Sequence, residues 1–324
     1  MKFGLKDPFQ VNTFSDQVHA LGGFTKTLSG VTLKPEEILS NTSIYNFKNT
    51  IFVAQRLLWV KSGSVTYNWR QNSSSILLSQ LDGDSGVKKL IEIHPESFED
   101  LESLEDPRLS SNNSKLEVWV AGCKFSGKQT SIRQLVIQLE DDFSVSSCEF
   151  PPFGRNLGVG YEKNWCPIPE SNLFVYQCGG EFIINNKISK DSWISRGVVW
   201  PFGDIHCGST PILIDGKYFM FYHSSLKLEF KESEKGYSPR QYYVGALMFS
   251  STPPYEVLAI TEQPLFFGSF NNKVVNGSPA AVFVTGSVLL SNLSLMFSLG
   301  LNDCESHVAE VPVENLLNKM VKFR

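Results

Sequence analysis

The tetrapeptide Glu105-Asp106-Pro107-Arg108 has the residue types best suited to acid–base chemistry in this chain. The proline fixes the backbone beside the aspartate, and Arg108 can orient a carboxylate or lower its pKa through bidentate pairing. A lone Asp-Pro-Arg string is nevertheless common, and by itself it indicates a turn with a surface ion pair. Other polar segments must therefore decide whether Asp106 is a catalytic residue.

A second segment places two charges, an amide and an indole together ahead of an expected strand. It contains Glu162, Lys163, Asn164 and Trp165. Sugars are bound by this mixture, because an aromatic face meets the C–H side of the ring while fixed donors and acceptors meet the hydroxyls. A charged loop with one buried tryptophan is the alternative interpretation.

A third segment contains Asp204, His206 and Thr210 and leads into a strand that ends near His223. The chain has only five histidines, and two of them lie beside one hairpin, which makes both of them candidate site residues. A lone histidine is more often structural than catalytic. Neither the His-x-x-x-His pattern nor a Cys/His spacing typical of zinc is present, so we expect no metal and no cofactor.

The segments that must position these residues are predicted to be mainly β-strands. Several units share one form, an apolar strand, a polar turn and a second aromatic-rich strand, which predicts hairpins. The second strands are centred near Phe52, Val118, Phe174, Phe219 and Leu295. Five units of this kind suit one four-stranded blade each and predict an all-β, five-bladed β-propeller. A two-sheet sandwich is the structural alternative.

We expect one catalytic domain over residues 1–324, with an N-terminal lead-in over about 1–40 and a short C-terminal helical turn over about 313–324. A further short helix is expected over 35–39. The polar stretches 82–105 and 226–239 are expected to be exposed loops.

The composition limits the classes of partner. Hydrophobic residues make up 42% of the chain and charged residues 19%, which permits a large core. A net charge of -4 leaves no basic excess for binding nucleic acid. No apolar run suits a signal peptide or a membrane span, and six widely spaced cysteines suggest reduced, mostly buried thiols. We therefore expect a cytoplasmic protein, with its oligomeric state left open.

Together these segments resemble glycoside hydrolase family 130, whose members are mannoside phosphorylases and β-mannosidases on a five-bladed propeller, and the related mannosyltransferase-phosphorylases. The resemblance covers about residues 41–310. The matching pieces are Asn41 with Ala54-Gln55-Arg56, Glu105-Asp106-Pro107-Arg108, Glu162-Lys163-Asn164-Trp165, Gly208-Ser209-Thr210-Pro211 with Tyr222-His223, Tyr243-Val244-Gly245-Ala246-Leu247 with Pro253-Pro254, Pro264-Leu265-Phe266, and Ser298-Leu299-Gly300-Leu301-Asn302-Asp303.

The resemblance implies that Asp106 is the general acid, acting through a substrate hydroxyl with inversion. It also implies a sugar site. The expected substrate-binding residues are Arg56, Glu105, Arg108, Glu162, Lys163, Asn164, Trp165, His206, Thr210, His223 and Asp303.

The resemblance further implies a phosphate site in the phosphorylases, held by arginines, a lysine and a histidine. His223 matches the histidine, whereas the lysine position falls on Asp204 and one arginine position falls in Tyr176-Gln177-Cys178. A carboxylate at such a site would repel phosphate. An inverting hydrolase instead needs a second carboxylate that activates water. We therefore expect Asp204 to be the general base, with Glu162 and Asp303 as alternatives.

The sequence is compatible with three functions. The first is an inverting hydrolase of an oligosaccharide or glycoside. The second is a glycosyltransferase that uses a nucleotide-sugar donor, for which Lys163, Arg56, Arg196 and Trp165 are the candidate ligands. The third is an inactive sugar-binding module, which is disfavoured because such a module has no need of an acid.

Overall fold

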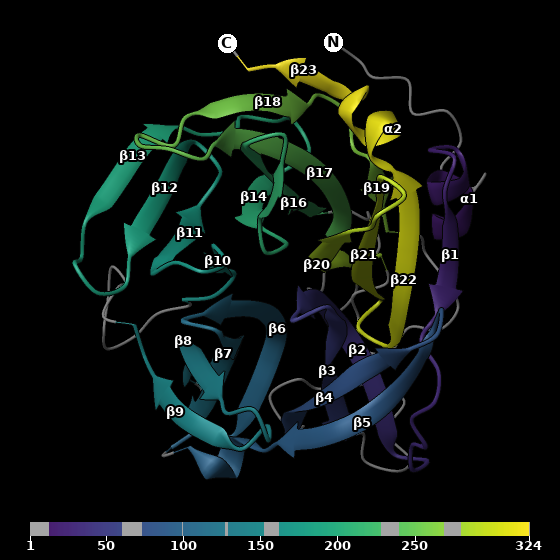
Figure 1. The fold of residues 1–324 in the computed structure, drawn as a ribbon, viewed down its shortest axis with the longest axis vertical. Coiled ribbons are helices and arrows are strands. Elements are labelled where there is room, and N and C mark those ends of the chain that lie inside the picture. Colours follow the sequence, from purple (N-terminus) through teal and green to yellow (C-terminus); the bar gives the residue numbers. More distant parts are fainter. Residues whose placement is uncertain are drawn as a thin grey trace, which may run out of the picture.

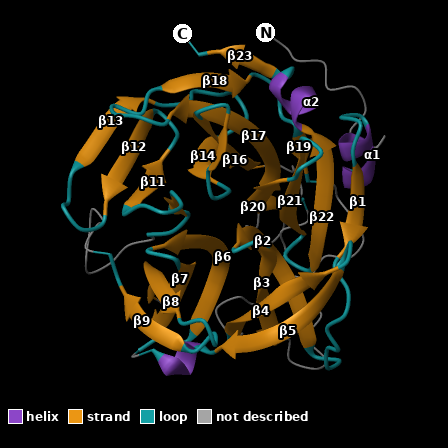
Figure 2. Ribbon diagram, viewed as in Figure 1, coloured by secondary structure: helices purple, strands orange, loops and turns teal. Residues whose placement is uncertain are grey.

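The computed structural model describes residues 13–59, 73–98, 100–126, 129–151, 162–227, 240–268 and 280–323. Strands dominate these ranges, and Figure 2 shows the few helical turns at the periphery. These are α1 (Phe14–His19), α2 (Val313–Leu317) and the 3-10 turn η1 (Pro95–Ser97). Separate sheets surround a common centre (Figure 1). The all-β propeller arrangement is thus confirmed, and the sandwich alternative is wrong.

Four of the sheets have four antiparallel strands each. The first contains β2 (Glu37–Phe47), β3 (Thr50–Trp59), β4 (Ser74–Asp82) and β5 (Gly86–Ile93). The second contains β6 (Ser103–Asn112), β7 (Lys115–Ser126), β8 (Gln129–Leu139) and β9 (Val145–Glu149). The third contains β10 (Cys166–Pro167), β11 (Leu173–Gln177), β12 (Glu181–Asn186) and β13 (Ser192–Arg196). The last contains β20 (Val282–Leu289), β21 (Ser294–Leu301), β22 (Glu305–Pro312) and β1 (Phe24–Thr27).

The remaining sheet has seven strands. Its path is β14 (Asp204–Cys207), β16 (Lys217–Lys227), β17 (Arg240–Ser250), β18 (Val257–Thr261) and β23 (Met320–Lys322), with β15 (Ile212–Ile214) on β16 and β19 (Phe266–Phe267) on β17. Because β16 and β17 are each 11 residues long, each pairs with two shorter strands end to end. The prediction of five equal four-stranded blades is therefore correct for four sheets only.

Both ends of the described chain join sheets. The N-terminal lead-in supplies β1, which pairs antiparallel with β22 and becomes the outer strand of the last sheet. The C-terminal segment is not one helical turn, because α2 ends at Leu317 and β23 then pairs with β18. Two other predictions are wrong: 35–39 contributes to β2, and 82–105 holds β5 and η1 between the ends of β4 and β6. The predicted loop 226–239 lies mostly outside the described residues.

The predicted hairpins are confirmed where the sequence carries turn residues. The β2–β3 turn consists of Lys48 and Asn49, whose φ values are 50° and 62°. The β15–β16 turn consists of Asp215 and Gly216, with φ values of 47° and 73°. Consecutive positive φ angles match the twist of the flanking strands, so these turns set the register of both hairpins.

Apolar side chains fill the spaces between neighbouring sheets. In one such space Phe221 lies 5.1 Å from Phe297 between ring centroids, and Phe266 lies 5.3 Å from Phe297, which joins the seven-stranded sheet to the last one. Each fully buried phenylalanine contributes about 2 kcal/mol of hydrophobic stabilisation. All six cysteines are free thiols, and four of them are buried. Across the described ranges, neither helix is long or apolar enough to span a bilayer.

Candidate active site

The Glu105–Arg108 segment forms an irregularity in the inner strand β6. The pairing of β6 with β7 shifts register between Glu105 and Arg108, and Asp106 has a φ of 50°. Left-handed backbone is unfavourable for a residue that precedes proline, and proline has no N–H for the ladder. Conformational strain of this kind concentrates at functional sites, where it aims a side chain away from its regular position.

Four Asx residues around the centre share this left-handed conformation. Their φ values are 46° for Asn41, 50° for Asp106, 68° for Asn164 and 54° for Asp303. Asparagine and aspartate tolerate the region better than other non-glycine residues do. Asn41 also lies at a register shift, between Ser40 and Ser43 in β2. Segments from different sheets therefore use the same backbone conformation where they place polar side chains around the centre.

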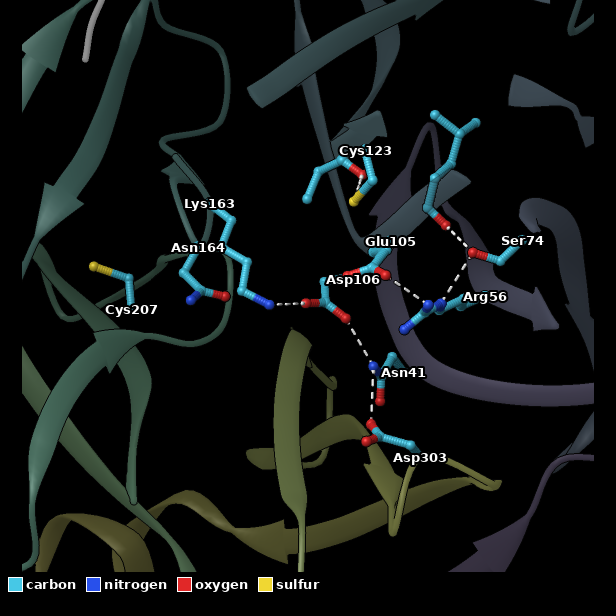
Figure 3. A network of polar contacts seen from close by, with 12 residues as sticks. Asn41, Arg56, Ser74, Glu105, Asp106, Cys123, Lys163, Asn164, Cys207 and Asp303 are labelled. Atoms are coloured by element: carbon cyan, nitrogen blue, oxygen red, sulfur yellow. Dashed lines mark hydrogen bonds and ion pairs between the residues drawn. The ribbon is translucent and has the colours of Figure 1, made fainter. Parts of the chain in front are cut away.

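Asp106 lies between an amide and an ammonium group (Figure 3). Asn41 Nδ2 donates to Asp106 Oδ1 at 2.7 Å, and Lys163 Nζ lies 3.5 Å from Asp106 Oδ2. Burial alone would raise the pKa of Asp106, but Lys163, Arg56 and Arg108 together lower it to about 2. The same attraction raises the pKa of Lys163 against the effect of its burial. Asp106 is therefore an ionised, buried carboxylate at neutral pH.

Arg56 and Glu105 form a second buried pair beside Asp106. Arg56 Nη2 lies 2.7 Å from Glu105 Oε1, and Arg56 Nε donates to Ser74 Oγ at 3.1 Å. The two charges are almost completely buried, so each depends on the other for compensation. The pair places the Arg56 charge close to Asp106, while the Asp106 carboxylate itself contacts Asn41 and Lys163.

Arg108 has a structural position rather than the predicted bidentate contact with a carboxylate. Its guanidinium donates to the backbone carbonyls of Gly208, Asp106 and Cys207 at 2.7, 3.2 and 3.2 Å, and to Asn164 Oδ1 at 3.2 Å. These acceptors belong to three different sheets or their inner loops. Arg108 therefore holds the centre of the ring together, and it affects Asp106 through its charge.

Asp303 and Asp106 both contact the side-chain amide of Asn41. Asn41 Nδ2 lies 3.4 Å from Asp303 Oδ1, the same nitrogen that donates to Asp106. Burial raises the pKa of Asp303, an effect to which the nearby Asp106 charge adds. Two carboxyl groups with opposite pKa shifts thus share one amide, an arrangement that separates acid and base roles in many active sites.

A cavity of about 520 Å³ lies beside this network. It is lined by Glu162, Lys163, Asn164, Trp165, Tyr176, Gln177, Cys178, Gly179, Gly180, Val198, Val199, Trp200, Gly203, Asp204, Ile205, His206 and Cys207. Its volume is in the range of about 300–1,000 Å³ that suits small-molecule ligands. Lys163 lines the cavity and also contacts Asp106, so it connects the cavity with the polar network around Asp106.

The two histidines of the third segment face each other across β14 and β16. His206 and His223 are paired in register, with ring centroids 5.5 Å apart. Burial lowers the pKa of His223 well below its usual value, and His206 and Arg108 add to this effect. His223 Nδ1 is buried without a hydrogen-bond partner among the described residues. His223 is therefore a neutral imidazole with unused hydrogen-bonding capacity.

Two predicted sugar ligands make contacts that hold the fold. Trp165 lines the cavity but is only 2% exposed, and it stacks on Phe174 with ring centroids 4.8 Å apart. Thr210 is buried and donates to the backbone carbonyl of Leu109 at 2.9 Å. Both side chains are packed inside the protein. A sequence pattern alone does not distinguish a packed side chain from one that binds a ligand.

Two residues that contact the predicted acids were not among the predicted site residues. Asn41 holds both Asp106 and Asp303, and Tyr176 donates its hydroxyl to Glu162 Oε2 at 3.2 Å. The available signal for Asn41 was an asparagine inside a predicted strand, where asparagine is disfavoured. Tyr176 belongs to the segment that the resemblance marks as an arginine position, but nothing in the sequence indicated its contact with Glu162.

We predict that Lys163→Met weakens the pH dependence of stability that Asp106 provides. The folded-state pKa of about 2 lies below the ordinary 3.8, so the stabilisation is present above about pH 4 and is lost as the pH falls towards 2. The difference corresponds to about 2 kcal/mol. Without the Lys163 charge the pKa of Asp106 rises, and urea unfolding should show a smaller loss of stability between pH 5 and pH 3. Lys217→Met, at the exposed first residue of β16, serves as the control. Equal losses in the wild type and Lys163→Met would contradict the pairing.

Comparison with known proteins agrees with this fold. No protein-family model matches the chain, and no curated protein matches its sequence. Among solved structures, β-1,2-mannobiose phosphorylase from Listeria innocua superposes with a TM-score of 0.62 at 13% identity, covering 89% of this chain and 94% of that one. A structure from the GH130 family of mannoside phosphorylases, described as containing hydrolases that target β-1,2 mannosidic linkages in Candida mannan, gives 0.60 at 14% identity, covering 85% and 84%.

A third similar structure is MPT-1, a GDP-Man-dependent mannosyltransferase from Leishmania mexicana. It superposes with a TM-score of 0.57 at 13% identity and covers 89% of this chain and 88% of that one. At these identities the likeness establishes the fold. The chain therefore has a propeller of the GH130 type, a fold that carries phosphorolysis, hydrolysis and glycosyl transfer in the proteins compared.

Proposed function

We propose that this protein is a carbohydrate-active enzyme that hydrolyses mannoside-type glycosidic bonds with inversion, with Asp106 as general acid and Asp204 as general base. The observation that carries the proposal is the position of Lys163. It contacts the buried Asp106 carboxylate at 3.5 Å and lines the cavity that Asp204 also lines. An inverting hydrolase requires a carboxyl group on each side of the bond that is cleaved, with room for a water molecule.

Asp106 must gain a proton before it can act as an acid, because its pKa of about 2 keeps it ionised in the free protein. Lys163 is the strongest of the charges that lower this pKa, and its side chain is 35% exposed. A sugar hydroxyl that replaces the ammonium group beside Asp106 would remove the largest of these charges, so the pKa of Asp106 would rise, with only the smaller effects of Arg56, Arg108 and Asn41 opposing burial. Substrate binding and protonation of Asp106 are therefore coupled through Lys163.

Two acids that line the cavity, Asp204 and Glu162, are candidates for the general base. Asp204 is exposed at the start of β14, two residues from His206, where it can contact water. Asp303 suits the role less well, because it shares the Asn41 amide with Asp106 and so lies on the acid's side. Glu162 lines the cavity and accepts from the Tyr176 hydroxyl at 3.2 Å, which makes it the alternative base.

The charges of the cavity disfavour phosphate as the acceptor. Asp204 and the segment Tyr176-Gln177-Cys178 line the cavity, and the resemblance calls for a lysine at the first and an arginine within the second. His223 adds no positive charge, because its burial keeps the imidazole neutral. A carboxylate in this position repels phosphate, and water is then the acceptor that remains.

Transfer from a nucleotide-sugar is less well supported by the residues proposed for it. Arg196 lies over the ring of Phe323 at 5.3 Å on the outer strand of its sheet, Trp165 is stacked in the core, and Arg56 is paired with Glu105. Of the four candidates, Lys163 alone combines the cavity lining with a contact to Asp106 in the described part of the chain. A binding module without activity would not require the strained Asp106 and its three neighbouring cations.

Product analysis tests the proposal. We expect free reducing sugar from β-mannosides, with β-1,2-mannobiose as the first substrate, and no nucleotide release from GDP-mannose. Asp204→Asn should lower kcat by about 10²–10⁴-fold, the range for loss of a general base. Asp215→Asn, in an exposed turn with a φ of 47°, is the matched control and should retain full activity. Full turnover by Asp204→Asn together with loss in Glu162→Gln would transfer the role to Glu162.

A further inference from the structure

The cavity beside Lys163 and Asp204 is larger than hydrolysis requires. Its volume is about 520 Å³, whereas one water molecule accounts for about 30 Å³ of liquid water. Volumes of about 300–1,000 Å³ are typical of sites for small organic ligands. The cavity therefore has room for a whole acceptor molecule in the place of an attacking water molecule, and its lining indicates the chemical class of that acceptor.

The cavity is accessible from solvent on the side of Asp204. Asp204 and His206 line it and are exposed, and Val199, which also lines it, is 74% exposed. Lys163 belongs to the same lining, and its ammonium group contacts Asp106 Oδ2 at 3.5 Å (Figure 3). A molecule can thus enter from solvent past Val199 and reach the space between Asp204 and the central network.

The polar groups of the lining favour a neutral hydroxyl compound. Glu162 and Asp204 supply carboxylates, which accept hydrogen bonds from hydroxyl groups and repel anions. Gln177 and His206 supply an amide and an imidazole, which can both donate and accept. The repulsion that disfavours phosphate does not act on a neutral molecule that carries several hydroxyls.

Tyr176 adds a fixed aromatic side chain to this lining. It is partly exposed, and its hydroxyl donates to Glu162 Oε2 at 3.2 Å. Its ring packs against Trp165 with centroids 5.3 Å apart. A held aromatic ring beside carboxylate, amide and imidazole groups suits a sugar, whose C–H face meets the ring while its hydroxyls meet the polar groups.

We propose that this cavity binds a neutral sugar as an acceptor, and that the protein transfers the glycosyl unit to a hydroxyl of this sugar as well as to water. The proposal rests on the proposed function, because Asp106 and Asp204 keep their roles. Asp204 takes the proton of the acceptor hydroxyl while its oxygen forms a bond to the anomeric carbon. The glycosidic C–O bond breaks, and the leaving oxygen keeps the electron pair and receives the proton from Asp106.

The stereochemistry of the product follows from this single displacement. Inversion at the anomeric carbon converts a β-mannoside into an α-mannoside of the acceptor. Asp106 ends the step ionised and Asp204 ends it protonated, and exchange with solvent restores both groups. A new α-linkage is therefore the expected signature of transfer, as free α-mannose is the signature of hydrolysis.

The test uses β-1,2-mannobiose as donor and methyl α-mannoside as acceptor over a range of acceptor concentrations, with products identified by proton NMR and mass spectrometry. We expect an α-linked methyl dimannoside whose yield saturates with acceptor concentration, because the acceptor occupies a site. Methyl α-mannuronoside, which differs by a carboxylate at C6, should give about tenfold less transfer product, since Glu162 and Asp204 repel it.

Val199→Phe tests the location of the acceptor. The larger side chain narrows the exposed side of the cavity, where water still passes, so the ratio of transfer product to free mannose should fall at least tenfold. Val145→Phe is the matched control, because Val145 is 45% exposed on the outer strand β9 and is not among the described residues that line the cavity. Its ratio should equal that of the wild type.

The outcomes separate this inference from the proposed function. Turnover of mannobiose to mannose alone, at every acceptor concentration, would overturn the acceptor site and leave hydrolysis intact. A yield that rises linearly without saturation, or an unchanged ratio in Val199→Phe, would also overturn it. No turnover of mannobiose would overturn the proposed function itself. Should Val199→Phe fail to fold, equal use of methyl α-mannoside and methyl α-mannuronoside by the wild type would overturn the inference.

Discussion

Replacing Asp106 with asparagine is expected to lower kcat on a β-mannoside by about 10²–10⁴-fold, the range for loss of a general acid. The asparagine keeps an oxygen that can accept from Asn41, which donates to Oδ1 at 2.7 Å, so the bulge and the sugar contacts should persist. The effect should therefore appear in kcat, with KM changed little. Steady-state kinetics measure both quantities.

The variant's near-UV circular dichroism provides the control, because it should match that of the wild type if the centre remains packed. A kcat within tenfold of the wild-type value, with an unchanged spectrum, would remove Asp106 from the reaction. A changed spectrum would call for Asp106→Glu, which keeps the charge but displaces the carboxylate and should also lose most of its turnover.

Arg108→Met is expected to destabilise the protein by about 3 kcal/mol or more, the largest stability effect at the centre. The guanidinium donates to three backbone carbonyls and to Asn164, and Arg108 is 1% exposed. Methionine fills similar space but leaves these buried acceptors unsatisfied. Urea unfolding at neutral pH measures the change.

Arg240→Met is the matched control for this experiment. Arg240 is exposed and donates through Nε to Ser225 Oγ at 2.9 Å, so its replacement should change stability by less than about 1 kcal/mol. Equal destabilisation by both variants would show that the contacts of Arg108 do not hold the sheets together.

The repeated hairpins made the propeller predictable from the sequence, because alternating apolar residues and Asn, Asp or Gly turns fix local pairing. The extra strands of the seven-stranded sheet were not predictable in the same way. β15, β19 and β23 have two or three residues each, too few to show a period. They exist because the long strands β16 and β17 and the edge strand β18 offer them unpaired backbone groups.

The motif segments indicated which polar residues gather at the centre, but not which contacts each of them makes. Asp106 contacts Lys163 and shares the Asn41 amide with Asp303. The identities of Arg108 and Trp165 suggested ligands. Arg108 instead donates to the carbonyl of Gly208, 100 positions away beside β14 of another sheet, and Trp165 stacks on the nearby Phe174. A sequence pattern does not specify which partner an arginine or an indole will find.

The most direct test of inverting hydrolysis is the first-formed product of β-1,2-mannobiose, followed by proton NMR in phosphate-free buffer and again with inorganic phosphate. We expect α-mannose to appear first, as inversion requires, and phosphate to change neither the rate nor the product. β-Mannose as the first product would contradict inversion. Mannose 1-phosphate formed only when phosphate is present would contradict hydrolysis and restore phosphorolysis.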